Sequence, residues 1–206
     1  MKIKYNSEEH HRRSIRVKGY DYTQPGAYFI TICTHTMKSI FGRVVNGEMQ
    51  LNECGIIVKN EWLKTGELRA NAVLDEYIIM PNHFHGIVII TDDGRGVLQY
   101  APTNNAFRSP SHTIGAIVRG FKSAVTKRIN IIIGMSGMPV WQRNYYEHII
   151  RNEKELNLIR EYIINNPLQW QFDRENPERV LVGANGRSPY DKQWGHFEEV
   201  IYGKTK

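Results

Sequence analysis

One stretch near the middle of the chain is apolar along its whole length. The run Gly86-Ile87-Val88-Ile89-Ile90 has no polar alternation, so neither face of a strand built from it could lie against water. We therefore expect this strand inside a sheet that is covered on both faces. Only Pro81-Asn82 separates the segment His83–Thr91 from the strand-like segment Ala72–Met80, and so tight a connection indicates antiparallel pairing.

Three further segments favour strands. Ala27–Thr34 is rich in β-branched and aromatic residues. Gly42–Leu51 has Asn46-Gly47 at its centre, and because Asn-Gly adopts positive φ at low cost, this segment predicts a hairpin with a type I′ turn. Val140–Ile150 is aromatic and strand-like.

Two helices are predicted between these strands. Asn52 can cap a helix that runs to about Leu68. The apolar positions available for its buried face are Ile56, Ile57, Trp62 and Leu63. A second helix opens at Ser111 or Thr113 and runs to about Arg128, with apolar residues at the helical period.

A third helix follows the last predicted strand. Asn152 and Glu155, three residues apart, have the form of a capping arrangement, with Asn in place of the usual Ser or Thr. The helix is expected to run to Asn165 or Asn166, because Pro167 disfavours its continuation. Strands and helices alternate with tight hairpins, so the fold class is predicted to be α+β, one antiparallel sheet with helices packed on it.

Three segments favour loops or irregular structure. Asp92–Ser111 is rich in Gly, Asn, Pro and Ser and predicts a long loop, and Asn130–Met138 predicts another. Residues 168–206 are expected to be irregular and packed on the main body.

Length and composition exclude several classes of protein. The 206 residues suit one domain with a tail, and no run approaches the roughly 18 apolar residues of a membrane helix. The charged N-terminus lacks the apolar core of a secretory signal, so a cytoplasmic location is expected. Cys33 and Cys54 cannot form a disulfide framework or a cysteine-based zinc knuckle, and we interpret both as reduced core thiols.

Positive charge is concentrated in one quarter of the chain. The net charge is +6, and residues 108–160 hold nine basic and three acidic residues, which equals that whole excess. A phosphate backbone is a natural partner for such a segment, although a solvated basic helix face explains the charge equally well.

Two histidines open the central strand. His83 and His85 are two residues apart, so both imidazoles point to the same face of a strand and can reach one ion. Two histidines satisfied by hydrogen bonds on a sheet face remain the alternative. On the third helix, Tyr162 and Asn166 are four residues apart and share one face, at the flank of the apolar stripe. They too could be ordinary residues at the rim of an amphipathic helix.

Taken together, these segments resemble a known family. His83-Phe84-His85 behind Met80-Pro81-Asn82 resembles the His-hydrophobic-His motif of HUH single-strand endonucleases. The segments Trp141–Arg143, Tyr146–Asn152 and Tyr162–Pro167 are similar in order and spacing to REP-associated tyrosine transposases, which are IS200-like single-tyrosine HUH transposases. The resemblance covers about Tyr20 to Trp170. Residues 1–19, an N-terminal basic arm, and 171–206, a C-terminal extension expected to pack on the domain, lie outside it.

The resemblance implies a ferredoxin-like HUH fold and a metal-dependent DNA strand transferase. His83 and His85 would hold Mg²⁺ or Mn²⁺, with Asn166 as the third ligand. Tyr162 would attack single-stranded or hairpin DNA and form a 5′-phosphotyrosine. Two imidazoles and an amide form a neutral ligand set, from which we expect weak binding and tolerance of several metals.

The resemblance also implies a DNA-binding surface along the basic segment. The candidate phosphate contacts are Arg119, Lys122, Lys127, Arg128, Arg143 and Arg151. Tyr145 and Tyr146 are the competing tyrosines, and the roles of Glu147 and His148 stay open. Family relatives occur as monomers and as homodimers, and the sequence does not choose between them.

Two other functions stay open. One is a catalytically inactive module that binds hairpin DNA on the same scaffold. The other is a zinc hydrolase that uses His83 and His85, for which the sequence offers no evident third strong ligand and no helical His-Glu-x-x-His motif.

Overall fold

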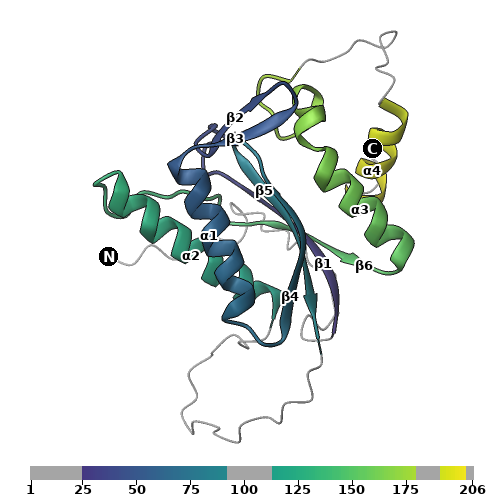
Figure 1. Ribbon diagram of the computed structural model, residues 1–206, viewed down its shortest axis with the longest axis horizontal. Helices are drawn as coiled ribbons and strands as arrows, with labels where there is room; N and C mark the ends of the chain where they lie inside the picture. The colour runs from purple at the N-terminus through teal and green to yellow at the C-terminus, as the bar shows by residue number, and fades with distance from the viewer. Residues whose placement is uncertain (1–24, 92–112, 180–190, 203–206) are drawn as a thin grey trace, which may run out of the picture.

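A computed structural model describes residues 25–91, 113–179 and 191–202 (Figure 1). The expected N-terminal arm at residues 1–19 and nearly all of the expected loop at Asp92–Ser111 lie outside these residues. No helix within the described ranges is long and apolar enough to cross a membrane.

The centre of the fold is a four-stranded antiparallel sheet in the order β4-β5-β1-β6. Its strands are β1 (Gly26–Cys33), β4 (Ala72–Ile79), β5 (His83–Ile90) and β6 (Tyr146–Ile150). Helix α1 (Glu53–Glu67) lies between β1 and β4 in the chain, after a separate hairpin, and helix α2 (Ile114–Ile132) lies between β5 and β6. This strand order with this alternation of strands and helices is the ferredoxin-like arrangement, so the predicted α+β fold class is confirmed.

The expected hairpin is present as a separate two-stranded sheet, β2 (Gly42–Val45) and β3 (Glu48–Leu51). At its tip Asn46 has φ of 53° and Gly47 has φ of 79°. Two successive positive φ values are what a type I′ turn requires, which confirms the prediction made from Asn-Gly.

Helices cover both faces of the main sheet. Helices α1 and α2 lie on one face, and α3 (Glu153–Asn165) and α4 (Asp191–Tyr202) lie on the other (Figure 1). The side chains of β5 divide between the two layers: Phe84 and Val88 pack with α1 and α2, and Ile87 packs with α3 and α4. The predicted position of this strand inside a doubly covered sheet is confirmed.

Helix α1 begins after Asn52, whose side-chain oxygen accepts a hydrogen bond from the Gly55 backbone N–H. The predicted apolar face is half wrong. Trp62 is buried as expected, but Ile56 is 49% exposed and Leu63 is 44% exposed. Each follows a buried residue directly, and one residue along a helix turns the side chain by about 100° and thus off the buried stripe.

Two predicted boundaries are also wrong. Helix α2 continues to Ile132, four residues beyond the expected end, with Thr113 as its N-cap. Only residues 146–150 of the expected long strand pair along β1, while Trp141 forms an isolated bridge with Thr34. The backbone carbonyls of Gln142 and Arg143 accept hydrogen bonds from the Lys122 ammonium. These two residues are therefore held by a side chain of α2 instead of by pairing with a strand.

The segment after α3 is more ordered than expected. The capping prediction for α3 is confirmed, since Asn152 Oδ1 accepts from the Glu155 N–H at 2.9 Å. Pro167 ends the α-helix, but a 3₁₀ helix, η1 (Pro167–Phe172), follows at once, and α4 comes later. The prediction of irregular structure was therefore wrong here. Phe197 and Ile201 of α4 are buried in the layer that contains α3.

Both cysteines are free thiols, as expected, but each is only partly buried. Cys54 lies in the first turn of α1 and packs at the edge of the core, and the Cys33 Sγ lies 3.5 Å from a carboxylate oxygen of Glu175. The expectation that both are core residues was wrong, since each sits at the border of the core.

Candidate metal centre

The two histidines of β5 lie side by side inside the protein. His83 and His85 are both 0% exposed, and their ring centroids are 4.5 Å apart. The strand register places Cys33 opposite His83 and Thr31 opposite His85. Because alternate residues of a strand share a face, both imidazoles point into the layer that contains α3.

Neighbouring side chains fix how each imidazole is presented. His83 Nδ1 lies 2.9 Å from Asn82 Oδ1. The Asn82 amide nitrogen already donates to the carbonyls of Met37 and Glu175, so its oxygen faces His83 and His83 Nδ1 must be the donor. This leaves the lone pair of His83 on Nε2. A hydrogen bond of this kind orients a histidine that binds a metal.

His85 is held in a similar way. Its Nδ1 lies 2.9 Å from Thr31 Oγ1, which also lies 3.2 Å from the Tyr202 hydroxyl. The Nε2 atoms of both histidines are buried and have no hydrogen-bond partner among the described residues. Two buried nitrogens without partners are costly unless a ligand occupies them, which distinguishes this pair from histidines satisfied within a sheet.

An acidic residue completes the cluster. Asp173, directly after η1, is 0% exposed, and one ligand atom from each of His83, His85 and Asp173 lies within 4.8 Å of the others. The Asp173 carboxylate accepts hydrogen bonds from Asn166 Nδ2 at 3.1 Å and from the Glu175 N–H at 2.6 Å. The sequence analysis did not identify Asp173.

Asn166 lies beside the acid. It is 0% exposed and forms the C-cap of α3, and its Oδ1 has no hydrogen-bond partner among the described residues. The oxygen of Asn166 and the two imidazole nitrogens are therefore three buried acceptor atoms that a cation could satisfy. The structure thus places Asn166 in hydrogen-bond contact with Asp173, the carboxylate of the histidine cluster.

Burial determines the charge of this cluster. Desolvation lowers the pKa of His83 to about 4, and it lowers the pKa of His85 well below its usual value. Desolvation also raises the pKa of Asp173 to about 6, although hydrogen bonds from Glu175 and Asn166 oppose this. At neutral pH the imidazoles are thus neutral and the carboxylate is ionised, which are the protonation states that a divalent metal requires.

The donor set fits a metal that accepts both nitrogen and oxygen. Imidazole suits zinc and similar transition metals, whereas carboxylate and amide oxygens suit magnesium and manganese. Two nitrogens, one carboxylate and one nearby amide oxygen therefore form a donor set that could hold a divalent metal ion. The expectation of a wholly neutral ligand set does not match the cluster, because Asp173 carries a negative charge.

Tyr162 packs directly against this cluster. It lies on α3, is 0% exposed, and its ring centroid is 5.3 Å from that of His85. Phe29 of β1 and Phe197 of α4 contact the other sides of the ring, with centroids 6.1 Å and 6.2 Å away. Tyr162 also shares a hydrogen bond with Tyr202 of α4. The ring contact thus brings Tyr162 beside His85, and Asn166 lies in the same region through its hydrogen bond to Asp173.

The competing tyrosines are engaged elsewhere. The Tyr145 hydroxyl donates to Glu147 Oε2 at 2.6 Å, and the Tyr146 hydroxyl donates to the backbone carbonyl of Ile201. His148 Nε2 lies 2.8 Å from a carboxylate oxygen of Glu155, which connects β6 to α3. These contacts account for the polar residues of β6 without a role in the cluster.

Four of the six expected DNA-contacting cations line one pocket, and the other two lie beside glutamates. Lys122 bonds to backbone carbonyls, Arg128 pairs with Glu61 at 2.5 Å, and Arg151 lies 3.9 Å from Glu155. Arg119, Lys127 and Arg143 are exposed and line a common pocket on the α2 side of the sheet.

Comparisons with known proteins show one family relationship. The chain is 47% identical over 180 residues to a Haemophilus influenzae protein described as uncharacterized, a match that spans 84% of this chain and 98% of that one. The chain belongs to the family of that protein. No protein-family model matches the sequence.

Two solved structures are similar to this chain at low sequence identity. One is a REP-associated tyrosine transposase bound to a REP hairpin, with 16% identity, coverage of 77% of this chain and 76% of that one, and a TM-score of 0.48. The other is a transposase candidate from Deinococcus radiodurans, with 17% identity, coverage of 73% and 95%, and a TM-score of 0.37.

Proposed function

We propose that this protein is a metal-dependent single-stranded DNA endonuclease and strand transferase. The observation that carries the proposal is the contact between Tyr162 and His85 inside a buried His-His-Asp cluster with two unsatisfied imidazole nitrogens. The similarity of the His83-Phe84-His85 and Tyr162–Pro167 segments to the HUH tyrosine transposases supports the same function.

His83, His85 and Asp173 would hold the metal, with the Asn166 oxygen next to them. A bound Mn²⁺ or Mg²⁺ would neutralise a phosphodiester and polarise it toward attack. Asn82 and Thr31 would keep the two imidazoles oriented, and the surrounding apolar residues would exclude bulk water from the reacting phosphate.

Tyr162 would be the nucleophile. Its hydroxyl oxygen forms a bond to phosphorus while the bond from phosphorus to the 3′-oxygen breaks, which leaves a 5′-phosphotyrosine and a free 3′-hydroxyl. The phenol loses one proton and the leaving oxygen gains one. Because the phosphodiester is exchanged rather than hydrolysed, the reverse reaction onto another 3′-hydroxyl needs no external energy source.

Access to Tyr162 requires α4 to move. Phe197 packs against the Tyr162 ring, and Tyr202 shares a hydrogen bond with it, so the nucleophile is fully covered in the described state. A phosphodiester could reach the hydroxyl only after these two side chains separate from it. The proposal therefore includes a conformational step that precedes the chemistry.

The test is formation of a covalent adduct. The protein would be incubated with hairpin-tipped single strands and Mn²⁺, denatured, and separated on a gel. We expect a denaturant-resistant adduct that chelator abolishes and that Tyr162→Phe lacks while still binding DNA. DNA binding without an adduct under all metal conditions would favour the catalytically inactive module instead.

A zinc hydrolase is the second candidate, because Asp173 supplies the third strong ligand that the sequence analysis did not find. Two imidazoles and a carboxylate form a common zinc set with one position open for water. This function predicts Zn²⁺-dependent hydrolysis that persists in Tyr162→Phe and leaves no covalent intermediate.

A further inference from the structure

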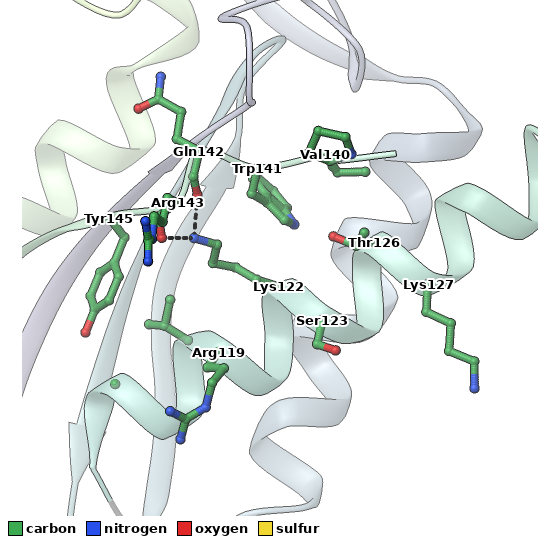
Figure 2. A pocket seen from close by; sticks show the side chains of 13 residues that line it. Arg119, Lys122, Ser123, Thr126, Lys127, Val140, Trp141, Gln142, Arg143 and Tyr145 are labelled. Atoms are coloured by element: carbon green, nitrogen blue, oxygen red, sulfur yellow. Dashed lines mark hydrogen bonds between the residues drawn. The ribbon is translucent and has the colours of Figure 1, made fainter. Parts of the chain in front are cut away.

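Figure 2 shows a pocket of about 620 Å³. It lies on the α2 side of the sheet, whereas the metal cluster lies on the α3 side. Helix α2 forms one wall and residues 139–145 form the other. This volume lies within the range of pockets that bind small ligands. Neither the histidine pair nor Tyr162 lines it, so it is a separate site.

The base of the pocket is apolar and held firmly in place. Val118, Val140 and Trp141 line it, and Trp141 is only 5% exposed. The Trp141 ring packs against Phe41 and Phe121, with centroids 5.0 Å and 6.0 Å away. This surface therefore belongs to the core and is preformed for a flat apolar group.

Tyr145 forms a side of the same pocket. Its hydroxyl donates to Glu147, which does not line the pocket, and its ring lies among the lining side chains (Figure 2). Because Tyr145 lines the pocket and this hydrogen bond restrains its ring, a ligand in the pocket can contact the ring. Aromatic rings held in this way bind unpaired bases with little regard to sequence.

The opening of the pocket is positively charged. Arg119, Lys127 and Arg143 line it and are exposed, and no acidic residue is among the described residues that line it. Lys122 is half-buried, and its ammonium bonds to the carbonyls of Gln142 and Arg143, which fixes the wall that carries Arg143 (Figure 2). The apolar floor and the aromatic side of the pocket match the nucleobase of one nucleotide. The cationic rim matches the phosphates of that nucleotide.

The pocket lies near the metal cluster along the sheet. Trp141 bridges to Thr34, while the preceding residue Cys33 pairs with His83. The backbones of Trp141 and His83 thus flank β1 on opposite sides, about two strand spacings or roughly 10 Å apart. Because the pocket and the cluster lie on opposite faces of the sheet, a single strand bound in the pocket would have to pass around a sheet edge, such as that formed by β6, to reach the cluster.

We propose that this pocket binds one unpaired nucleotide of a single-stranded DNA, outside the segment that enters the metal cluster. The base stacks on Tyr145 over the apolar surface, and the adjoining phosphates contact Arg119, Lys127 and Arg143. The class of ligand rests on the proposed function, whereas the position of the subsite rests on the pocket itself.

The test is fluorescence anisotropy with a labelled ten-nucleotide oligothymidine in the presence of chelator. We expect the full-length protein to bind this strand about ten times more tightly than an abasic strand of equal length, and more tightly than the duplex. Tyr145→Leu removes the preference for bases, and Tyr145→Phe restores it because the ring is retained. The double variant Arg119→Gln/Lys127→Gln loses two phosphate contacts. Its plot of log association constant against log salt concentration should therefore be less steep by about 1.4.

The matched control is Arg43→Gln/Lys59→Gln, which removes one arginine and one lysine that are exposed on β2 and α1, outside the pocket. The inference would be overturned if the two double variants changed the salt dependence equally. It would also be overturned if the abasic strand bound as tightly as oligothymidine, or if the duplex bound more tightly. Tyr162→Phe keeps this binding in chelator. Loss of the adduct with intact pocket binding would therefore refute only the proposed function, and adduct formation insensitive to the pocket variants would refute only the subsite.

Discussion

Metal affinity should depend on pH through one group, the Asp173 carboxylate. Its pKa is raised to about 6 by burial, whereas burial lowers the pKa of His83 to about 4 and that of His85 well below its usual value. Between pH 7 and pH 5 the imidazoles therefore stay neutral. Lowering the pH through this window protonates only the carboxylate, and a metal must displace that proton to bind.

The size of the effect follows from these values. A single competing proton with a pKa of about 6 weakens the apparent affinity about tenfold between pH 7 and pH 5. Two histidines with an ordinary pKa near 6.5 would instead weaken it by roughly 600-fold over the same interval. The measured slope thus distinguishes a site with desolvated imidazoles from one with solvent-exposed imidazoles.

Calorimetric titration of the metal-free protein with Mn²⁺ at several pH values would measure this slope. The control is Asp173→Asn, which keeps the shape of the side chain and should bind Mn²⁺ more weakly but with little change from pH 7 to pH 5. A wild-type slope near zero, or a tenfold loss that persists in Asp173→Asn, would refute the assignment of the carboxylate to the site.

Three further outcomes are expected. Thr31→Val removes the hydroxyl that holds His85 and should weaken Mn²⁺ binding about tenfold with an unchanged fold, while Thr65→Val, a buried change within α1, should leave calorimetric binding as it is. Phe197→Ala loosens α4 over the nucleophile and should speed adduct formation on a denaturing gel by at least about tenfold; an unchanged rate would mean that α4 does not control access. Lys122→Met removes an ammonium bonded to backbone carbonyls and should lower the free energy of unfolding by about 2 kcal/mol in a urea titration, a loss that a purely DNA-binding lysine would not cause.

The parts of the fold that could be predicted from the sequence depend on local signals. The apolar run Gly86–Ile90, the Asn46-Gly47 turn and the caps at Asn52 and Asn152 each lie within a few residues of the structure they determine. The histidine pair could be predicted for the same reason, because strand geometry alone puts alternate side chains on one face.

The parts that could not be predicted depend on contacts between distant segments. Asp173 reaches the histidines only because η1 turns the chain back after Pro167, and the sequence pattern favoured irregular structure there. Its one signal was an acidic residue directly after the aromatic segment Trp170–Phe172 and seven residues beyond Asn166. Charge alone likewise could not distinguish Lys122, which bonds to carbonyls, from Arg119, which stays exposed.

The most direct measurement is mass spectrometry of the protein after reaction with a hairpin-tipped single strand and Mn²⁺, followed by digestion of both components. We predict a nucleotide phosphate attached to the peptide that contains Tyr162, and no such peptide when chelator is present. A modified peptide that contains Tyr145 or Tyr146 instead, or cleaved DNA with no modified peptide, would contradict the assignment of Tyr162 as the nucleophile.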